Sequence, residues 1–153
     1  MATSRNRLRV CAHANVLLSG AATDNPSSAS RVVLVASELT LLDLVACERV
    51  LEECDRNLGR LVESEAQLQK LKETLEGTRG RSIEVARTPS VEGRSLPDTD
   101  PKDRVHLLSA VEQGCDYLVT LNPKDVPKSY EDVTVIEPGT PTGRIREQIK
   151  GLA

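Results

Sequence analysis

Side chains that could bind a metal ion or a phosphate stand in four segments of this chain. They are His13 and Asn15, Glu52 and Glu53, Asp103, and Asn122 with Asp125. Carboxylates that are held close together repel one another, and a hard divalent cation such as Mg²⁺ or Mn²⁺ relieves this repulsion while keeping positions open for water and a phosphate. The residue types therefore indicate metal-dependent hydrolysis of a phosphodiester, if the fold brings the four segments together.

Strands that alternate with helices are the elements that would position these side chains. The apolar patterns predict strands over residues 8–12, 39–45, 82–86, 116–121 and 134–137 and helices over residues 29–37, 47–58, 61–77 and 100–113, with a terminal helix after Pro138-Gly139. Such an alternation favours a parallel sheet with helices on both faces, and ligands bind beyond the carboxyl ends of its strands. We therefore expect an α/β three-layer sandwich around a central, mostly parallel sheet of about five strands, with residues 1–7 flexible and residues 8–153 forming one domain.

Asp103 has a structural explanation beside its functional one. Asp100 lies at the predicted N-cap and Pro101 at the first helical position, so the Asp103 carboxylate would close a capping box and face the positive end of the helix dipole. His106 follows about one helical turn later. A packed or surface histidine within hydrogen-bond reach of Asp103 is its ordinary interpretation.

The polar residues at the strand exits also have two interpretations each. Asn15 could orient a ligand or form a local Asx turn, and Thr120 could offer its hydroxyl to a phosphate or be a half-buried strand residue. Asn122 precedes Pro123, which is a turn signature in itself, and Asp125 could be a surface charge of the same turn.

Composition restricts the class of protein. The net charge of −3 gives no general attraction to nucleic acid, and an aromatic content of 1% leaves no platform for base stacking. No apolar run approaches the length of about 18 residues that a membrane helix needs. The four cysteines show no C-x-x-C pair, which favours buried free thiols and a cytoplasmic protein.

Four segments, taken in the order in which they follow one another along the chain, resemble the PIN domains. The matching segments are residues 10–17 (VCAHANVL), 50–58 (VLEECDRNL), 100–103 (DPKD) and 114–125 (GCDYLVTLNPKD). PIN domains are typically metal-dependent ribonucleases, and many are toxins of bacterial toxin–antitoxin pairs. The resemblance therefore implies a PIN-like fold, Mg²⁺ or Mn²⁺ as cofactor and RNA as substrate, with an antitoxin protein and a second copy of the chain as partners.

The resemblance also assigns roles to individual residues. It places the four acidic positions of the family, in order, at His13, Glu53, Asp103 and Asn122, with Asp125 three residues after the last. It selects Glu53 over Glu52, a choice that helix periodicity leaves open. The implied catalytic residues and metal ligands are Glu53 and Asp103, the further ligands are Asp125 and His13, and the substrate-orienting residues are Asn15, Thr120 and Asn122.

His13 stands where the family has its first acid, and three interpretations of it remain. It could be a substitute ligand that suits Mn²⁺ or Zn²⁺ better than Mg²⁺, an imidazolium that pairs with Glu53 and Asp103 in place of the metal, or a packed remnant of a lost site. We favour the second or third, because the loss of a carboxylate removes charge that a hard cation needs. Two functional hypotheses follow, a PIN-like ribonuclease and a catalytically inactive PIN-like module that binds RNA or protein.

Overall fold

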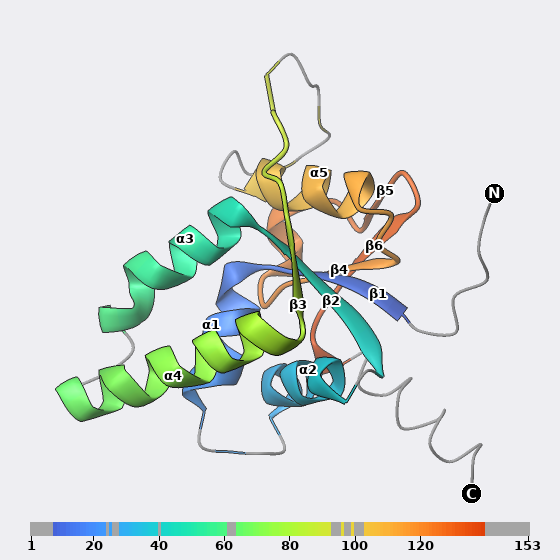
Figure 1. Cartoon of the computed structure of the whole chain (residues 1–153). Coiled ribbons are helices and arrows are strands. Elements are labelled where there is room, and N and C mark those ends of the chain that lie inside the picture. The colour runs from blue at the N-terminus through green and yellow to red at the C-terminus, as the bar shows by residue number, and fades with distance from the viewer. Residues whose placement is uncertain are drawn as a thin grey trace, which may run out of the picture.

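A six-stranded sheet forms the centre of the computed structural model, which describes residues 8–23, 25, 28–39, 41–60, 64–92, 96, 99 and 103–139 (Figure 1). The described elements are, in chain order, β1 (Leu8–Ala12), α1 (Ala14–Ala22), α2 (Ala29–Glu38), β2 (Leu42–Cys47), α3 (Glu48–Asn57), α4 (Glu65–Arg81), β3 (Ile83–Ala86), α5 (Arg104–Glu112), β4 (Tyr117–Val119), β5 (Ser129–Tyr130) and β6 (Val133–Ile136). The strand order is β3-β2-β1-β4-β6-β5, and only β5 is antiparallel to its neighbour. The expected α/β fold with a mostly parallel sheet is therefore confirmed.

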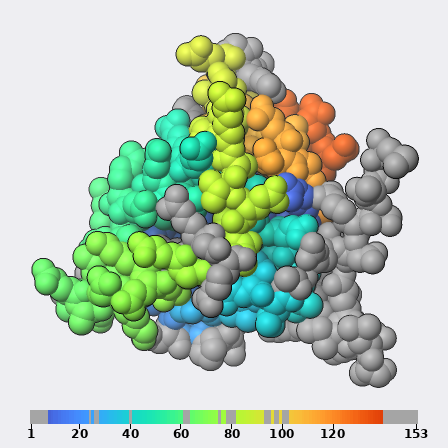
Figure 2. Space-filling model, in the orientation of Figure 1, coloured from blue at the N-terminus to red at the C-terminus, as the bar shows by residue number. Residues whose placement is uncertain are grey.

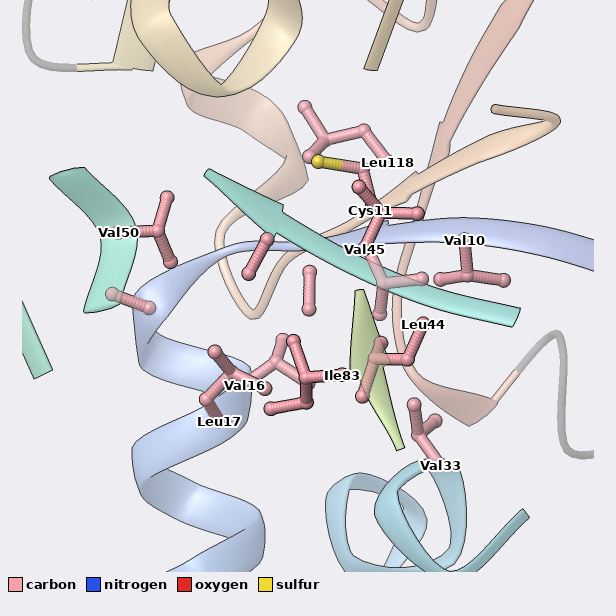
Figure 3. Close-up of a cluster of buried hydrophobic side chains, with 14 of the residues drawn as sticks. Val10, Cys11, Val16, Leu17, Val33, Leu44, Val45, Val50, Ile83 and Leu118 are labelled. Atoms are coloured by element: carbon pink, nitrogen blue, oxygen red, sulfur yellow. The ribbon is translucent and has the colours of Figure 1, made fainter. Parts of the chain in front are cut away.

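Helices cover both faces of the sheet. Helix α5 packs against β1, β2 and β4 on one face, whereas α2 and α4 contact β2 and β3 on the other and α1 packs against both of these helices (Figure 1). In Figure 3, Val16, Leu17 and Val33 gather with Leu44 on the side of α1 and α2. None of the described helices is both long enough and apolar enough to cross a bilayer.

Two elements differ from the prediction because tertiary packing decides them. Helix α1 was not predicted: it packs against three other helices, α2, α3 and α4, so its sequence lacks the polar face that reveals an amphipathic helix. Helix α4 does not end at Gly77 but runs to Arg81, just before β3. A glycine inside a helix costs only about 1 kcal/mol relative to alanine, so it did not stop this one.

Smaller differences concern strand bounds. The second strand is Leu42–Cys47 rather than residues 39–45, and a short strand, β5, was not predicted. It pairs with β6 because Glu131 adopts a left-handed backbone conformation (φ 51°) that reverses the chain. Residues 1–7, Asp100, Pro101 and the expected terminal helix lie outside the described residues. All four cysteines are buried free thiols, as predicted.

Arg9 ties strand β1 to two distant elements. Its Nε donates a hydrogen bond to the carbonyl of Gln113 (2.7 Å), directly after α5. Its two terminal nitrogens donate to the Glu84 carboxylate on β3 (2.6 and 2.9 Å), and its backbone N–H donates to Asp116 Oδ2 (2.8 Å). Arg9 therefore holds the end of α5 and the edge strand β3 in place relative to β1. Figure 2 shows part of β3 at the surface of the molecule.

The ion pair between Arg9 and Glu84 predicts a pH-dependent contribution to stability. The hydrogen bonds and charge of Arg9 lower the pKa of Glu84, so the contribution is present above the ordinary glutamate pKa and is lost as the pH falls through the lowered value. We expect Glu84→Gln to reduce the free energy of unfolding at neutral pH by less than about 1 kcal/mol, since the Glu84 side chain is 53% exposed. Urea unfolding should show the difference shrinking in acid and in high salt, and a difference that grows in acid would contradict it.

The crossing of α1 and α2 predicts a second effect on stability. A Cβ atom at Gly20 would lie 2.7 Å from the carbonyl oxygen of Ser30 and 2.8 Å from Leu34 Cδ1, so Gly20→Ala forces the helices apart. We expect a loss of about 1–3 kcal/mol in the free energy of unfolding. Gly59→Ala is the matched control, because no atom lies within 4 Å of a Cβ there. Equal stability of the two variants in urea would show that the crossing tolerates the extra methyl.

Candidate functional site

His13 lies at the carboxyl end of β1, where the chain turns directly into α1. Its backbone N–H donates a hydrogen bond to the carbonyl of Val119 at the end of β4 (3.0 Å). Its side chain caps α1, since Nδ1 accepts a hydrogen bond from the backbone N–H of Asn15 (3.1 Å). The imidazole thereby takes the capping role that a carboxylate oxygen often has at the start of a helix.

The other nitrogen of His13 faces Asp103. Nε2 lies 2.8 Å from Asp103 Oδ1. Because Nδ1 accepts a hydrogen bond, it carries no proton, and the single proton of a neutral imidazole must therefore be on Nε2. His13 is thus a neutral donor to the carboxylate rather than the imidazolium of our second interpretation, although its partner is Asp103 as that interpretation expected.

Asp103 immediately precedes α5 and is only 4% exposed. Its side chain makes no capping hydrogen bond to α5, and Asp100, the other residue of the predicted capping box, lies outside the described residues. The carboxylate instead points across to the end of β1 and meets His13. Asp103 therefore contributes a buried carboxyl group to the carboxyl edge of the sheet, where the strands β1 and β4 end.

His106 is buried beneath His13. It is 1% exposed, and the centroids of the two imidazole rings lie 3.9 Å apart with a tilt of 36°. Burial lowers the pKa of His106 to about 3, so the ring is neutral at neutral pH. Neither ring nitrogen has a hydrogen-bond partner among the described residues. A buried polar atom without a partner costs about 1–3 kcal/mol, so this ring needs a further explanation.

These residues form a group that could hold an ion. One ligand atom each from His13, Asp103 and His106 lies within 4.8 Å of the other two. Glu53 on α3 borders the group: its Oε2 is 3.8 Å from His106 Nε2, and its side chain is 23% exposed. The fold therefore brings together three of the predicted site residues, His13, Glu53 and Asp103, and adds His106.

The loop after β4 is tied to α1 beside this group. Asn15 Nδ2 donates to Thr120 Oγ1 (3.4 Å), and the backbone N–H of Leu121 donates to Asn15 Oδ1 (3.3 Å). Asn15 therefore holds the loop and does not form the local Asx turn considered above. Asn122 is exposed, and Asp125 is half-buried in the 3-10 turn Pro123–Asp125. Within the described part of the chain, the Asp125 carboxylate does not belong to the group of ligand atoms.

His106 is the site residue that sequence reasoning missed. It was interpreted as a packed or surface histidine, and it is indeed packed. Within the described part of the chain, however, neither ring nitrogen has a hydrogen-bond partner, and two carboxyl groups lie beside the ring. Its separation of three residues from Asp103 was the available signal. That separation places both side chains on one side of a helix, but it cannot show that α5 packs on β1 or that Glu53 of α3 lies beside His106.

Comparison with known proteins identifies a family. Residues 9–124 match a family model described as PIN domain. No curated protein matches the chain. The matched region begins in β1 and ends in the turn after β4, so it contains every residue of the group described above.

The arrangement around His13 predicts its tautomer. In a long-range ¹H–¹⁵N spectrum of the metal-free protein at about pH 8, above the ordinary histidine pKa, we expect His13 to show a protonated Nε2 and an unprotonated Nδ1. The reason is that Nδ1 must accept the hydrogen bond from Asn15. The His13→Asn variant identifies the signals by their absence. A protonated Nδ1 in His13 would contradict the hydrogen-bond arrangement.

Proposed function

This chain belongs to the PIN domain family, and from that premise we propose that it is a ribonuclease that hydrolyses RNA phosphodiesters with a divalent metal ion. PIN domains are generally nucleases that use divalent metals. The observation that carries the proposal is the group of ligand atoms from His13, Asp103 and His106, with Glu53 at its border, at the carboxyl edge of the sheet. We place the activity in the cytoplasm, where four free thiols stay reduced.

The residues present fit a divalent ion. Asp103 offers a buried carboxylate and Glu53 a second carboxylate that is partly exposed. His106 offers a neutral imidazole that has no hydrogen-bond partner in the part of the chain that the structure describes. A bound cation would offset the negative charge of both carboxylates. In this proposal Glu53 and Asp103 hold the ion. Asp125 could bind it through water.

Each remaining residue has a positioning role in the proposal. The metal, when bound, lowers the pKa of a water molecule and neutralises charge that develops on the phosphate. His13 donates to Asp103 and so keeps this carboxylate turned towards the ion. Asn15 and Thr120 hold the loop after β4 at the border of the site, where Asn122 can reach a nucleotide.

A pocket beside this loop suits one end of the RNA. It has a volume of about 330 Å³ and is lined by Leu121, Asn122, Pro123, Lys124 and Glu137. Lys124 supplies a cation for a backbone phosphate, and the chain, with two tyrosines and no other aromatic residue, offers little surface for base stacking. We infer that the protein binds the phosphate backbone of the RNA rather than its bases.

One observation favours a second candidate function. The hydrogen bond between His13 Nε2 and Asp103 Oδ1 satisfies the buried carboxylate without a metal ion. A domain in which this bond persists would bind RNA or a protein partner without cleaving it. The two candidates share the fold and differ in whether Asp103 is available to an ion.

Cleavage of a mixed-sequence RNA with Mg²⁺ or Mn²⁺ separates the two candidates. We expect the unmodified protein to cleave, and Asp103→Asn and Glu53→Gln to lose at least about 100-fold in rate, because each removes charge from the site. Glu52→Gln is the matched control, since Glu52 is the exposed neighbour of Glu53 on the same helix.

Each other outcome has a defined meaning. Activity that survives Asp103→Asn would come from another enzyme and would contradict the proposal. Activity that appears only after His13→Asp would show that His13 makes the site catalytically inactive, and the second candidate function would then hold.

A further inference from the structure

The two histidines of the site differ in what their nitrogens can do. Both ring nitrogens of His13 are engaged, one by the backbone N–H of Asn15 and one by Asp103. Both ring nitrogens of His106 lack a hydrogen-bond partner among the described residues, although the side chain is 1% exposed. Only His106 therefore has a lone pair that no other group uses.

His13 is a poor metal ligand for a reason of proton placement. A metal on Nε2 requires a lone pair there, so the ring proton would have to move to Nδ1. Nδ1 would then point its proton at the N–H of Asn15, 3.1 Å away, and two donors would face each other at the start of α1.

His106 has the geometry that His13 lacks. Its Nε2 lies 3.8 Å from Glu53 Oε2, and a ligand atom of its ring lies within 4.8 Å of the Asp103 carboxylate. The His13 ring covers one face of the His106 ring, so an ion reaches His106 in the plane of the ring, from the side of Glu53. Glu53 does not belong to the group of ligand atoms within 4.8 Å of one another, so its side chain, which is 23% exposed, must turn to bind the same ion.

The donor set determines the kind of metal. Mg²⁺ takes oxygen ligands and dehydrates reluctantly, whereas an imidazole nitrogen suits Zn²⁺ and similar transition metals. We propose that this site binds a Zn²⁺-type ion through His106, Asp103 and Glu53, with His13 as a positioning residue that donates to Asp103 and not as a ligand. This inference rests on the proposed function for the location of the site, and it changes the expected metal.

Cobalt is a suitable probe for this site, because Co²⁺ replaces Zn²⁺ and absorbs visible light according to its ligands. We expect the full chain to bind one Co²⁺ with the absorption of a site of nitrogen and oxygen ligands and without a thiolate charge-transfer band. A thiolate band would place the ion on the cysteines and overturn the proposal. Zn²⁺ should displace Co²⁺, and an excess of Mg²⁺ should not.

Variants separate ligands from positioning residues. Glu53→Gln and His106→Gln should abolish the cobalt spectrum, while Glu52→Gln keeps it. His13→Asn should keep the shape of the spectrum and weaken binding by no more than about 100-fold, as expected of a residue that only orients a ligand. A spectrum lost in His13→Asn but kept in His106→Gln would overturn the ligand assignment.

Because His106 is buried, its variant could unfold, so the unmodified protein supplies an independent measurement. Addition of Zn²⁺ should shift the ¹⁵N signal of a His106 ring nitrogen and leave His13 with a protonated Nε2. No shift at His106, or metal binding restricted to Mg²⁺, overturns the inference. Zn²⁺ binding without RNA cleavage would support the zinc site and contradict the proposed function. RNA cleavage with Mg²⁺ but no Zn²⁺ binding would support the proposed function and contradict the zinc site.

Discussion

The site depends on one imidazole ring that makes two opposite hydrogen bonds. His13 accepts at Nδ1 to begin helix α1 and donates at Nε2 to a buried carboxylate. Neither role can change alone, because a neutral imidazole has one ring proton. Moving that proton from Nε2 to Nδ1 turns the donor into an acceptor and the acceptor into a donor. The start of α1, the orientation of Asp103 and, in the metal site that we propose, the choice of ligand are therefore linked through the placement of a single proton.

The parallel sheet explains why residues distant in sequence meet at this ring. β1 lies between β2 and β4, and its carboxyl end places His13 beside the exit of β4 and below the start of α5. Arg9, at the other end of the same strand, binds the carbonyl of Gln113 just beyond the far end of α5. The strand thus contacts the beginning and the end of one helix, which fixes how Asp103 and His106 face the strand exits.

The sequence predicted the fold, whereas the roles that it assigned to individual site residues stay predictions. Helix α3 and the five longer strands were recognisable from apolar spacing, and the likeness to PIN domains selected Glu53 on that helix. The spacing of apolar residues could not reveal α1, because a helix that is buried on most sides lacks polar residues that recur at helical spacing. Nor could it reveal that His106 is enclosed or which nitrogen of His13 carries the proton, since burial and hydrogen-bond partners arise from contacts between residues about 90 positions apart.

The central place of β1 also bears on how the protein is made. β1 is the first described strand to leave the ribosome, but one of its two neighbours, β4, begins only at Tyr117. Until that segment has been synthesised, one edge of β1 has no strand to pair with, and Val10 and Cys11 lack part of their core. Contacts between residues so far apart slow folding. The sheet is therefore completed late in translation, and during that interval the nascent chain carries an open strand edge that other chains can pair with.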